Sequence, residues 1–143
     1  MKTIWLLPAL VVFTGTLMTA SQAQCAPQIV SSSEAPALIV KNVQIDQRDG
    51  KIRGTVSLRF GYGAPLLPHV HVYGLNPSGQ VVAEGCDKLS GALLSNPRPV
   101  GKGHSAFSAN LGDLAGVTTI RVVASAGHSS DCKIEDNRII KLF

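Results

Sequence analysis

Two histidines one residue apart are the first candidates for chemistry in this chain. His69 and His71 alternate with Val70 and Val72, and on a strand this spacing puts both imidazoles on one face, about 7 Å apart at Cα. Imidazole is a preferred ligand of zinc and copper, and His128 is a candidate third ligand. Two interpretations stay open: a Cu or Zn site, or two solvent-facing side chains on a strand whose valines are buried.

Three cysteines, Cys25, Cys86 and Cys132, form the second group of reactive side chains. An odd number leaves at least one thiol outside any intramolecular disulfide. The preferred pair is Cys86–Cys132, a crosslink worth about 4 kcal/mol in the chain-entropy model. Cys25 would then be free, lipidated or bonded to another molecule.

The sequence contains little evidence for a catalytic site. Residues 128–131 read His-Ser-Ser-Asp, but catalytic triads are assembled from distant segments rather than from neighbours in one loop. No Gly-x-Ser-x-Gly elbow or phosphate-binding glycine motif is present, and Glu135 and Asp136 are adjacent, so their side chains should diverge. We therefore predict that the protein is not an enzyme and has no catalytic residues.

The first 23 residues have the organisation of a secretory signal peptide. Lys2 precedes an apolar run over residues 4–13, and Ser21-Gln22-Ala23 fits the small-x-small cleavage rule. The run is shorter than the roughly 20 residues of a transmembrane helix. The sequence therefore predicts an exported protein, periplasmic or secreted, without a transmembrane span.

An N-terminal lipid anchor at Cys25 is an alternative to simple release. Bacterial lipoprotein signals place a small residue directly before the cysteine and an aliphatic residue three before it. Gln24 and Gln22 occupy those positions here, so cleavage after Ala23 and a soluble product are favoured.

Charge argues against one class of partner. The chain has 13 Lys and Arg against 9 Asp and Glu, a formal net charge of +4. The basic residues are scattered and are not interleaved with aromatic side chains, so we expect no nucleic-acid partner.

The remaining sequence has the period of β-strands. Residues 24–36 are predicted to form a flexible leader and residues 37–143 a single domain. In residues 51–60, Ile52, Val56, Leu58 and Phe60 fall on one predicted buried face. Turn signals separate about seven predicted strands, at 38–47, 51–60, 69–75, 80–86, 105–111, 118–126 and 138–143.

The number and spacing of these strands over residues 37–143 resemble an immunoglobulin-like or fibronectin-III-like domain. Residues 69–79 and 102–108 are also similar to stretches of small secreted bacterial proteins. The resemblance implies an all-β, antiparallel β-sandwich in a bacterial periplasm, and it implies no particular activity.

An immunoglobulin-like topology would place Cys86, Cys132 and His128 near the start of the 69–75 strand, whereas His104 would point outward from the opposite sheet. Loops carry function on such scaffolds. We therefore predict a non-catalytic binding module for an envelope protein or glycan, with contacts in the loops at 61–68, 87–103 and 127–137. The candidate contact residues are Tyr62, Leu66, Leu67 and Arg98.

Overall fold

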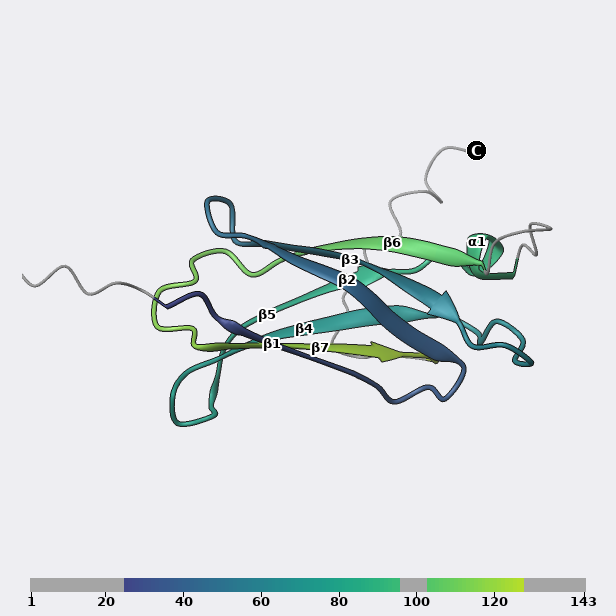
Figure 1. Ribbon diagram of the computed structural model, residues 1–143, viewed down its shortest axis with the longest axis horizontal. Coiled ribbons are helices and arrows are strands. Elements are labelled where there is room, and N and C mark those ends of the chain that lie inside the picture. Colours follow the sequence, from purple (N-terminus) through teal and green to yellow (C-terminus); the bar gives the residue numbers. More distant parts are fainter. Residues whose placement is uncertain (1–24, 96–102, 128–143) are drawn as a thin grey trace, which may run out of the picture.

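Two β-sheets facing one another form the protein, as the computed structural model in Figure 1 shows. The structure describes residues 25–95 and 103–127. The predicted signal peptide at 1–23 and the predicted strand at 138–143 lie outside these residues.

Seven strands and one short helix make up the described chain. Their bounds are β1 Gln28–Ser33, β2 Leu38–Asp46, β3 Lys51–Leu58, β4 His69–Leu75, β5 Val81–Lys88, α1 Gly91–Ser95, β6 His104–Asn110 and β7 Thr119–Ser125.

The strands form a four-stranded sheet in the order β1-β7-β4-β5 and a three-stranded sheet in the order β2-β3-β6. This confirms the predicted all-β sandwich. The strand pairs are antiparallel except for β1 and β7, which run parallel. The expectation of a wholly antiparallel fold is therefore wrong at this one pair.

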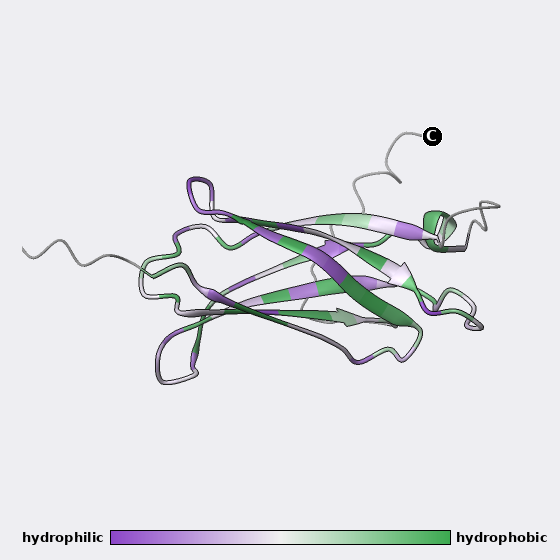
Figure 2. Ribbon diagram, in the orientation of Figure 1, coloured by the Kyte–Doolittle hydropathy of each residue, from purple (hydrophilic) through white to green (hydrophobic). Residues whose placement is uncertain are grey.

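The core lies between the two sheets and follows the predicted alternation. Hydrophobic and hydrophilic residues alternate along the strands (Figure 2), and the apolar positions face inward. Side chains from both sheets are buried together, and this packing fixes the face that each strand presents to solvent. The largest fully buried side chains are Leu38, Ile52, Leu94, Ile120, Val56, Val70, Val72 and Val122.

Within the predicted flexible leader at 24–36, residues 28–33 form a strand, β1. All six residues of β1 are exposed, so the sequence shows no buried face there. Backbone pairing with β7 holds the strand instead, in the register Gln28↔Thr119 to Ser33↔Ala124.

The strand predicted over 51–60 ends two residues early, at Leu58. The Arg59 amide donates to the carbonyl of Ala37, and the Tyr62 amide donates to the carbonyl of Arg59. This turn takes the chain away from the sheet. Phe60, predicted to be buried, is therefore exposed.

A helical turn, α1, occupies part of the segment predicted to be irregular at 87–103. The Ser90 hydroxyl accepts a hydrogen bond from the Leu93 amide at 3.3 Å, which caps the turn, and Leu94 is buried. No helix within the described residues is long and apolar enough to cross a membrane.

Candidate functional site

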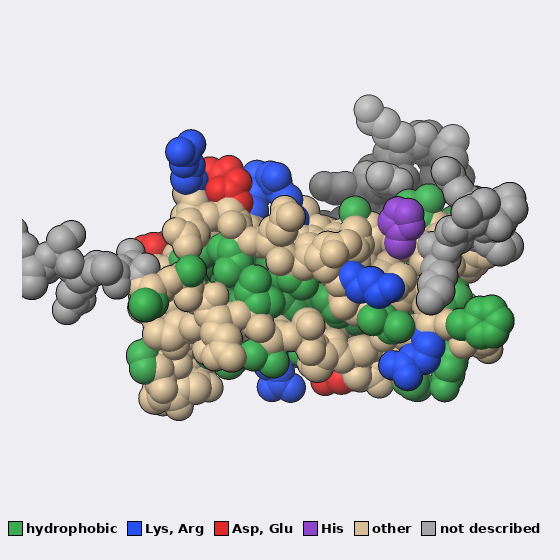
Figure 3. Space-filling model, in the orientation of Figure 1, with side chains coloured by type: hydrophobic (Ala, Val, Ile, Leu, Met, Phe, Trp, Pro, Cys, Tyr) green, Lys and Arg blue, Asp and Glu red, His purple; other side chains and the backbone are tan. Residues whose placement is uncertain are grey.

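The loop between β3 and β4, residues 59–68, carries the three most exposed large hydrophobic side chains in the described chain, together with Tyr62. Phe60 is 89% exposed, Leu66 85%, Leu67 57% and Tyr62 49%. Apolar side chains protrude at the right-hand end of the molecule, where this loop lies (Figure 3). We call residues 59–68 the apolar loop.

Backbone hydrogen bonds hold both ends of the apolar loop. The Arg59 amide donates to the Ala37 carbonyl at 2.7 Å, and the Gly127 amide donates to the Leu66 carbonyl at 2.9 Å. The Leu89 amide donates to the Pro68 carbonyl at 2.9 Å. The loop is therefore tied to three separate segments, while the side chains of Phe60, Leu66 and Leu67 extend into solvent.

Exposed side chains of this size are costly to leave in water. Complete burial of a Phe or Leu side chain contributes about 1.5–3 kcal/mol. A partner that covers Phe60 and Leu66 would gain this burial free energy for each of the two side chains. The loop has one charged residue, Arg59, and no group arranged as a nucleophile or a general base, so its chemistry is that of a contact surface.

Three of the four predicted contact residues, Tyr62, Leu66 and Leu67, lie together in the apolar loop. The fourth, Arg98, lies outside the described residues. Sequence reasoning missed Phe60, because the alternation of residues 51–60 placed it on the buried face. The following Gly-Tyr-Gly-Ala-Pro segment was the local signal that the strand had ended.

The predicted histidine pair is present on β4, but His69 is not a solvent-facing residue. It is 5% exposed, and its Nδ1 lies 2.9 Å from the Leu67 carbonyl oxygen. A carbonyl at this distance favours the tautomer with the proton on Nδ1. Nε2 is then the nitrogen with an electron pair for a ligand.

The rings of His69 and His71 are neighbours. Their centroids are 4.9 Å apart at an interplanar angle of 82°, and the His71 ring stacks on Tyr73 at 5.9 Å. Within the described chain, no group of three or more His, Cys, Asp or Glu side chains is arranged to hold a metal ion. The predicted third ligand, His128, lies outside the described residues.

Cys86 lies opposite His71 in the pairing of β4 with β5. It is half-buried and is not among the free cysteines of the described chain. Its predicted disulfide partner, Cys132, lies outside the described residues, so the pairing stays a prediction.

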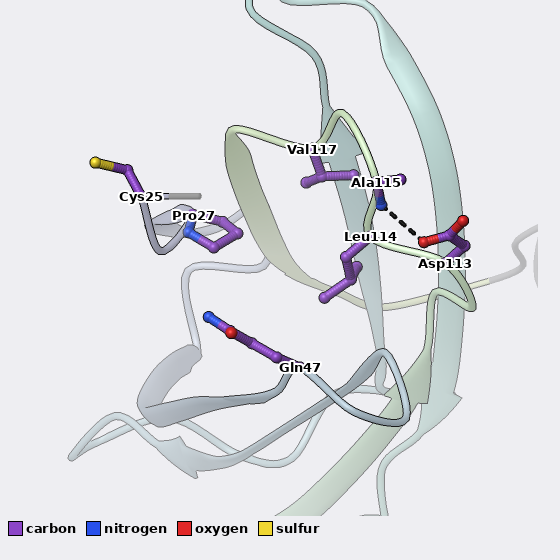
Figure 4. A pocket seen from close by; sticks show the side chains of 7 residues that line it. All are labelled: Cys25, Pro27, Gln47, Asp113, Leu114, Ala115 and Val117. Carbon is purple, nitrogen blue, oxygen red and sulfur yellow. Dashed lines mark hydrogen bonds between the residues drawn. The ribbon is translucent and has the colours of Figure 1, made fainter. Parts of the chain in front are cut away.

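Cys25 is free and exposed, and it closely precedes β1, which begins at the opposite end of the sandwich from the apolar loop (Figure 1). It borders a hollow of about 280 Å³ lined mainly by residues 113–117 (Figure 4). The Ala115 amide closes a turn there by donating to Asp113 Oδ1 at 2.9 Å. The Cys25 sulfur points away from the hollow, so this pocket does not bring the thiol to a binding site.

The chain matches no protein-family model, no curated protein and no solved structure. Its function must therefore follow from the geometry of its own residues.

Proposed function

We propose that this protein is a non-catalytic exported binding module that contacts an envelope protein or glycan through its apolar loop. The observation that carries the proposal is the exposure of Phe60 and Leu66 at 89% and 85%. Large apolar side chains gathered on one exposed segment are typical of an interaction site.

The anchoring of the loop supports the same proposal. Ordering a mobile segment on binding costs conformational entropy, and a pre-ordered segment avoids part of that cost. The hydrogen bonds of Arg59, Leu66 and Pro68 to other segments restrain the backbone before a partner arrives. Aromatic anchors surrounded by smaller contacts are also the usual energetic centres of interfaces, and Phe60 and Tyr62 suit that role.

Export and the immunoglobulin-like or fibronectin-III-like resemblance belong to this proposal. The signal-like residues 1–23 support a periplasmic or secreted protein. The two facing sheets support a scaffold whose loops at one end present the contacts. β1 runs parallel to β7, and a family that includes this chain should share this strand pairing.

The test replaces the two most exposed side chains. We expect Phe60→Ser with Leu66→Ser to abolish the binding of purified protein to envelope fractions without lowering its thermal stability. The matched control is Val81→Ser with Val82→Ser, because both valines are about half exposed and lie on β5. Protease-treated and glycosidase-treated fractions distinguish a protein partner from a glycan.

Equal binding by the wild type and the Phe60/Leu66 variant would contradict the role of the apolar loop. Turnover of a substrate by the purified protein would contradict the non-catalytic proposal.

A periplasmic metal-binding function for copper or zinc is the second candidate, with His69, His71 and His128 as ligands. The 4.9 Å separation of the His69 and His71 rings favours it. Titration with Cu(II) and Zn(II) should show tighter binding to the wild type than to a His69→Ala, His71→Ala variant. His104→Ala is the control, since His104 is exposed on β6 in the other sheet. Identical titrations of all three proteins would exclude the site.

A further inference from the structure

The free edge of β1 is a sheet edge without the usual protection against pairing. β1 is the outermost strand of the four-stranded sheet, and its six residues, Gln-Ile-Val-Ser-Ser-Ser, are all exposed. The strand contains no charge and no proline. An uncharged exposed edge is a template for another strand.

The other three sheet edges of the described chain each carry a protective feature. The β2 edge has a bulge between Lys41 and Gln44, where Asn42 takes a φ of 52°, and it carries the charged residues Lys41 and Asp46. Bulges and charges are devices that natural proteins use to prevent edge pairing.

The β5 and β6 edges protect each other. Asp87 of β5 accepts a hydrogen bond from the Ser108 amide of β6 at 2.6 Å. At Gly85 of β5, an added Cβ would lie 2.6 Å from the Asn110 carbonyl oxygen, so the two backbones approach closely there. β1 is therefore the one unprotected edge among the residues that the structure describes.

The backbone pattern of β1 shows which groups are available at this edge. The Gln28 amide donates to the Thr118 carbonyl, and the Glu34 amide donates to the Ala124 carbonyl. Backbone groups alternate in direction along a strand, so the even-numbered residues of β1 bond to β7. The N–H and C=O groups of Ile29, Ser31 and Ser33 point away from the sheet.

We propose that β1 pairs antiparallel with β1 of a second copy of this chain, with Ser31 on the two-fold axis. This register places Ile29 opposite Ser33 of the second copy, and Ser31 opposite Ser31 of the second copy. All the outward-pointing backbone groups of both strands then become hydrogen-bonded pairs.

The side chains of β1 are compatible with pairing to themselves. In the proposed register, Ile29 and Val30 each lie opposite a serine of the second copy, so large residues meet small ones. When a strand pairs with an identical strand, the residue on the two-fold axis lies opposite its own copy. A charged residue there would therefore face a like charge, which is destabilising. β1 has no charge to repel its own copy, which favours a second copy as the occupant.

A cysteine at the two-fold axis tests this register. Directly opposite residues in a hydrogen-bonded antiparallel pair have Cα atoms about 5.5 Å apart, which suits a disulfide. We expect Ser31→Cys in a Cys25→Ser background to form a covalent dimer under mild oxidation. The matched control is Gln44→Cys in the same background, on the exposed β2 edge, which should remain monomeric.

Sedimentation of the uncrosslinked protein provides the second readout. Wild type should associate reversibly as its concentration rises. Ser31→Lys, which places two like charges on the axis, should raise the dissociation constant by roughly fivefold. Gln44→Lys should leave it unchanged, and circular dichroism of both variants checks that the fold is intact.

Three results would overturn the proposal. The first is a wild type that stays monomeric at every concentration tested. The second is no more dimer from the Ser31→Cys protein than from the Gln44→Cys protein, as expected if residues 138–143 of the same chain occupied this edge. The third is a monomeric wild type whose binding to a different protein is lost in Ser31→Lys. The apolar loop test is independent, because the loop and β1 are separate surfaces.

Discussion

Ser57 and Ser105 are both buried serines on adjacent strands, but only one of them has a hydrogen-bond partner for its hydroxyl. Ser105 Oγ accepts from the Ser90 amide at 2.9 Å, whereas Ser57 Oγ has no partner. A buried hydroxyl without a hydrogen bond lowers the stability of the fold. Removing a hydroxyl that accepts a hydrogen bond instead leaves its donor, here a backbone amide, without a partner. The two serines should therefore respond oppositely to the same substitution.

We predict that Ser57→Ala leaves the free energy of unfolding unchanged or raises it by about 1 kcal/mol, because the substitution removes a buried hydroxyl that has no hydrogen-bond partner. Ser105→Ala should lower the free energy of unfolding by about 1–3 kcal/mol, because the Ser90 amide loses its acceptor. Urea denaturation measures both values. A large loss of stability in Ser57→Ala would show that this hydroxyl has a partner after all.

At the scale of elements, the β2–β3 hairpin depends on more than its turn. Gly50 has a φ of 61° in the turn between β2 and β3, and its carbonyl accepts from the Leu111 amide. A Cβ at Gly50 would overlap the carbonyl group of Gly112. The hairpin therefore packs against the turn after β6 without room for any side chain.

We expect Gly50→Ala to lower the free energy of unfolding by about 3 kcal/mol or more, from backbone strain and steric overlap together. Gly79→Ala is the matched control, since Gly79 has a φ of 80° with open space around it. It should cost only the left-handed strain, about 1–2 kcal/mol. Equal losses in thermal or chemical denaturation would refute the close packing at Gly50.

The whole molecule separates its two chemically distinctive ends. Cys25 closely precedes β1, which begins at one end of the sandwich, and the apolar loop lies at the other end. A lipid on Cys25 would therefore direct the apolar loop away from the membrane. Antiparallel pairing of two β1 strands would likewise leave the two apolar loops at opposite ends of the dimer, both open to partners.

The intact mass of the protein purified from its native compartment tests the covalent predictions. We expect cleavage after Ala23, a disulfide between Cys86 and Cys132, and one thiol, Cys25, that alkylates without reduction. Reduction before alkylation should add two further labels. A lipid mass at the N-terminus, or three labels without reduction, would refute the released, disulfide-bonded form.

Much of the fold could be predicted from local patterns. Alternation placed Val70 and Val72 inward, and it gave β2, β4, β6 and β7 within one or two residues of their observed bounds. The glycines and prolines of residues 61–68 placed Tyr62, Leu66 and Leu67 in one loop. These predictions succeeded because a half-buried strand must alternate and a glycine- and proline-rich segment cannot continue one.

What the sequence by itself determined was therefore which side chains share a face and where the chain can turn. Only the tertiary structure decided where β3 ends, that β1 forms, and which edges remain open. β3 stops at Leu58 because its partner β2 begins at Leu38, so Phe60 is left in solvent. β1 forms because β7 offers backbone groups to it, although its own side chains are exposed. Backbone hydrogen bonds between strands join residues far apart in sequence, and they do not depend on the side-chain pattern that a single sequence displays.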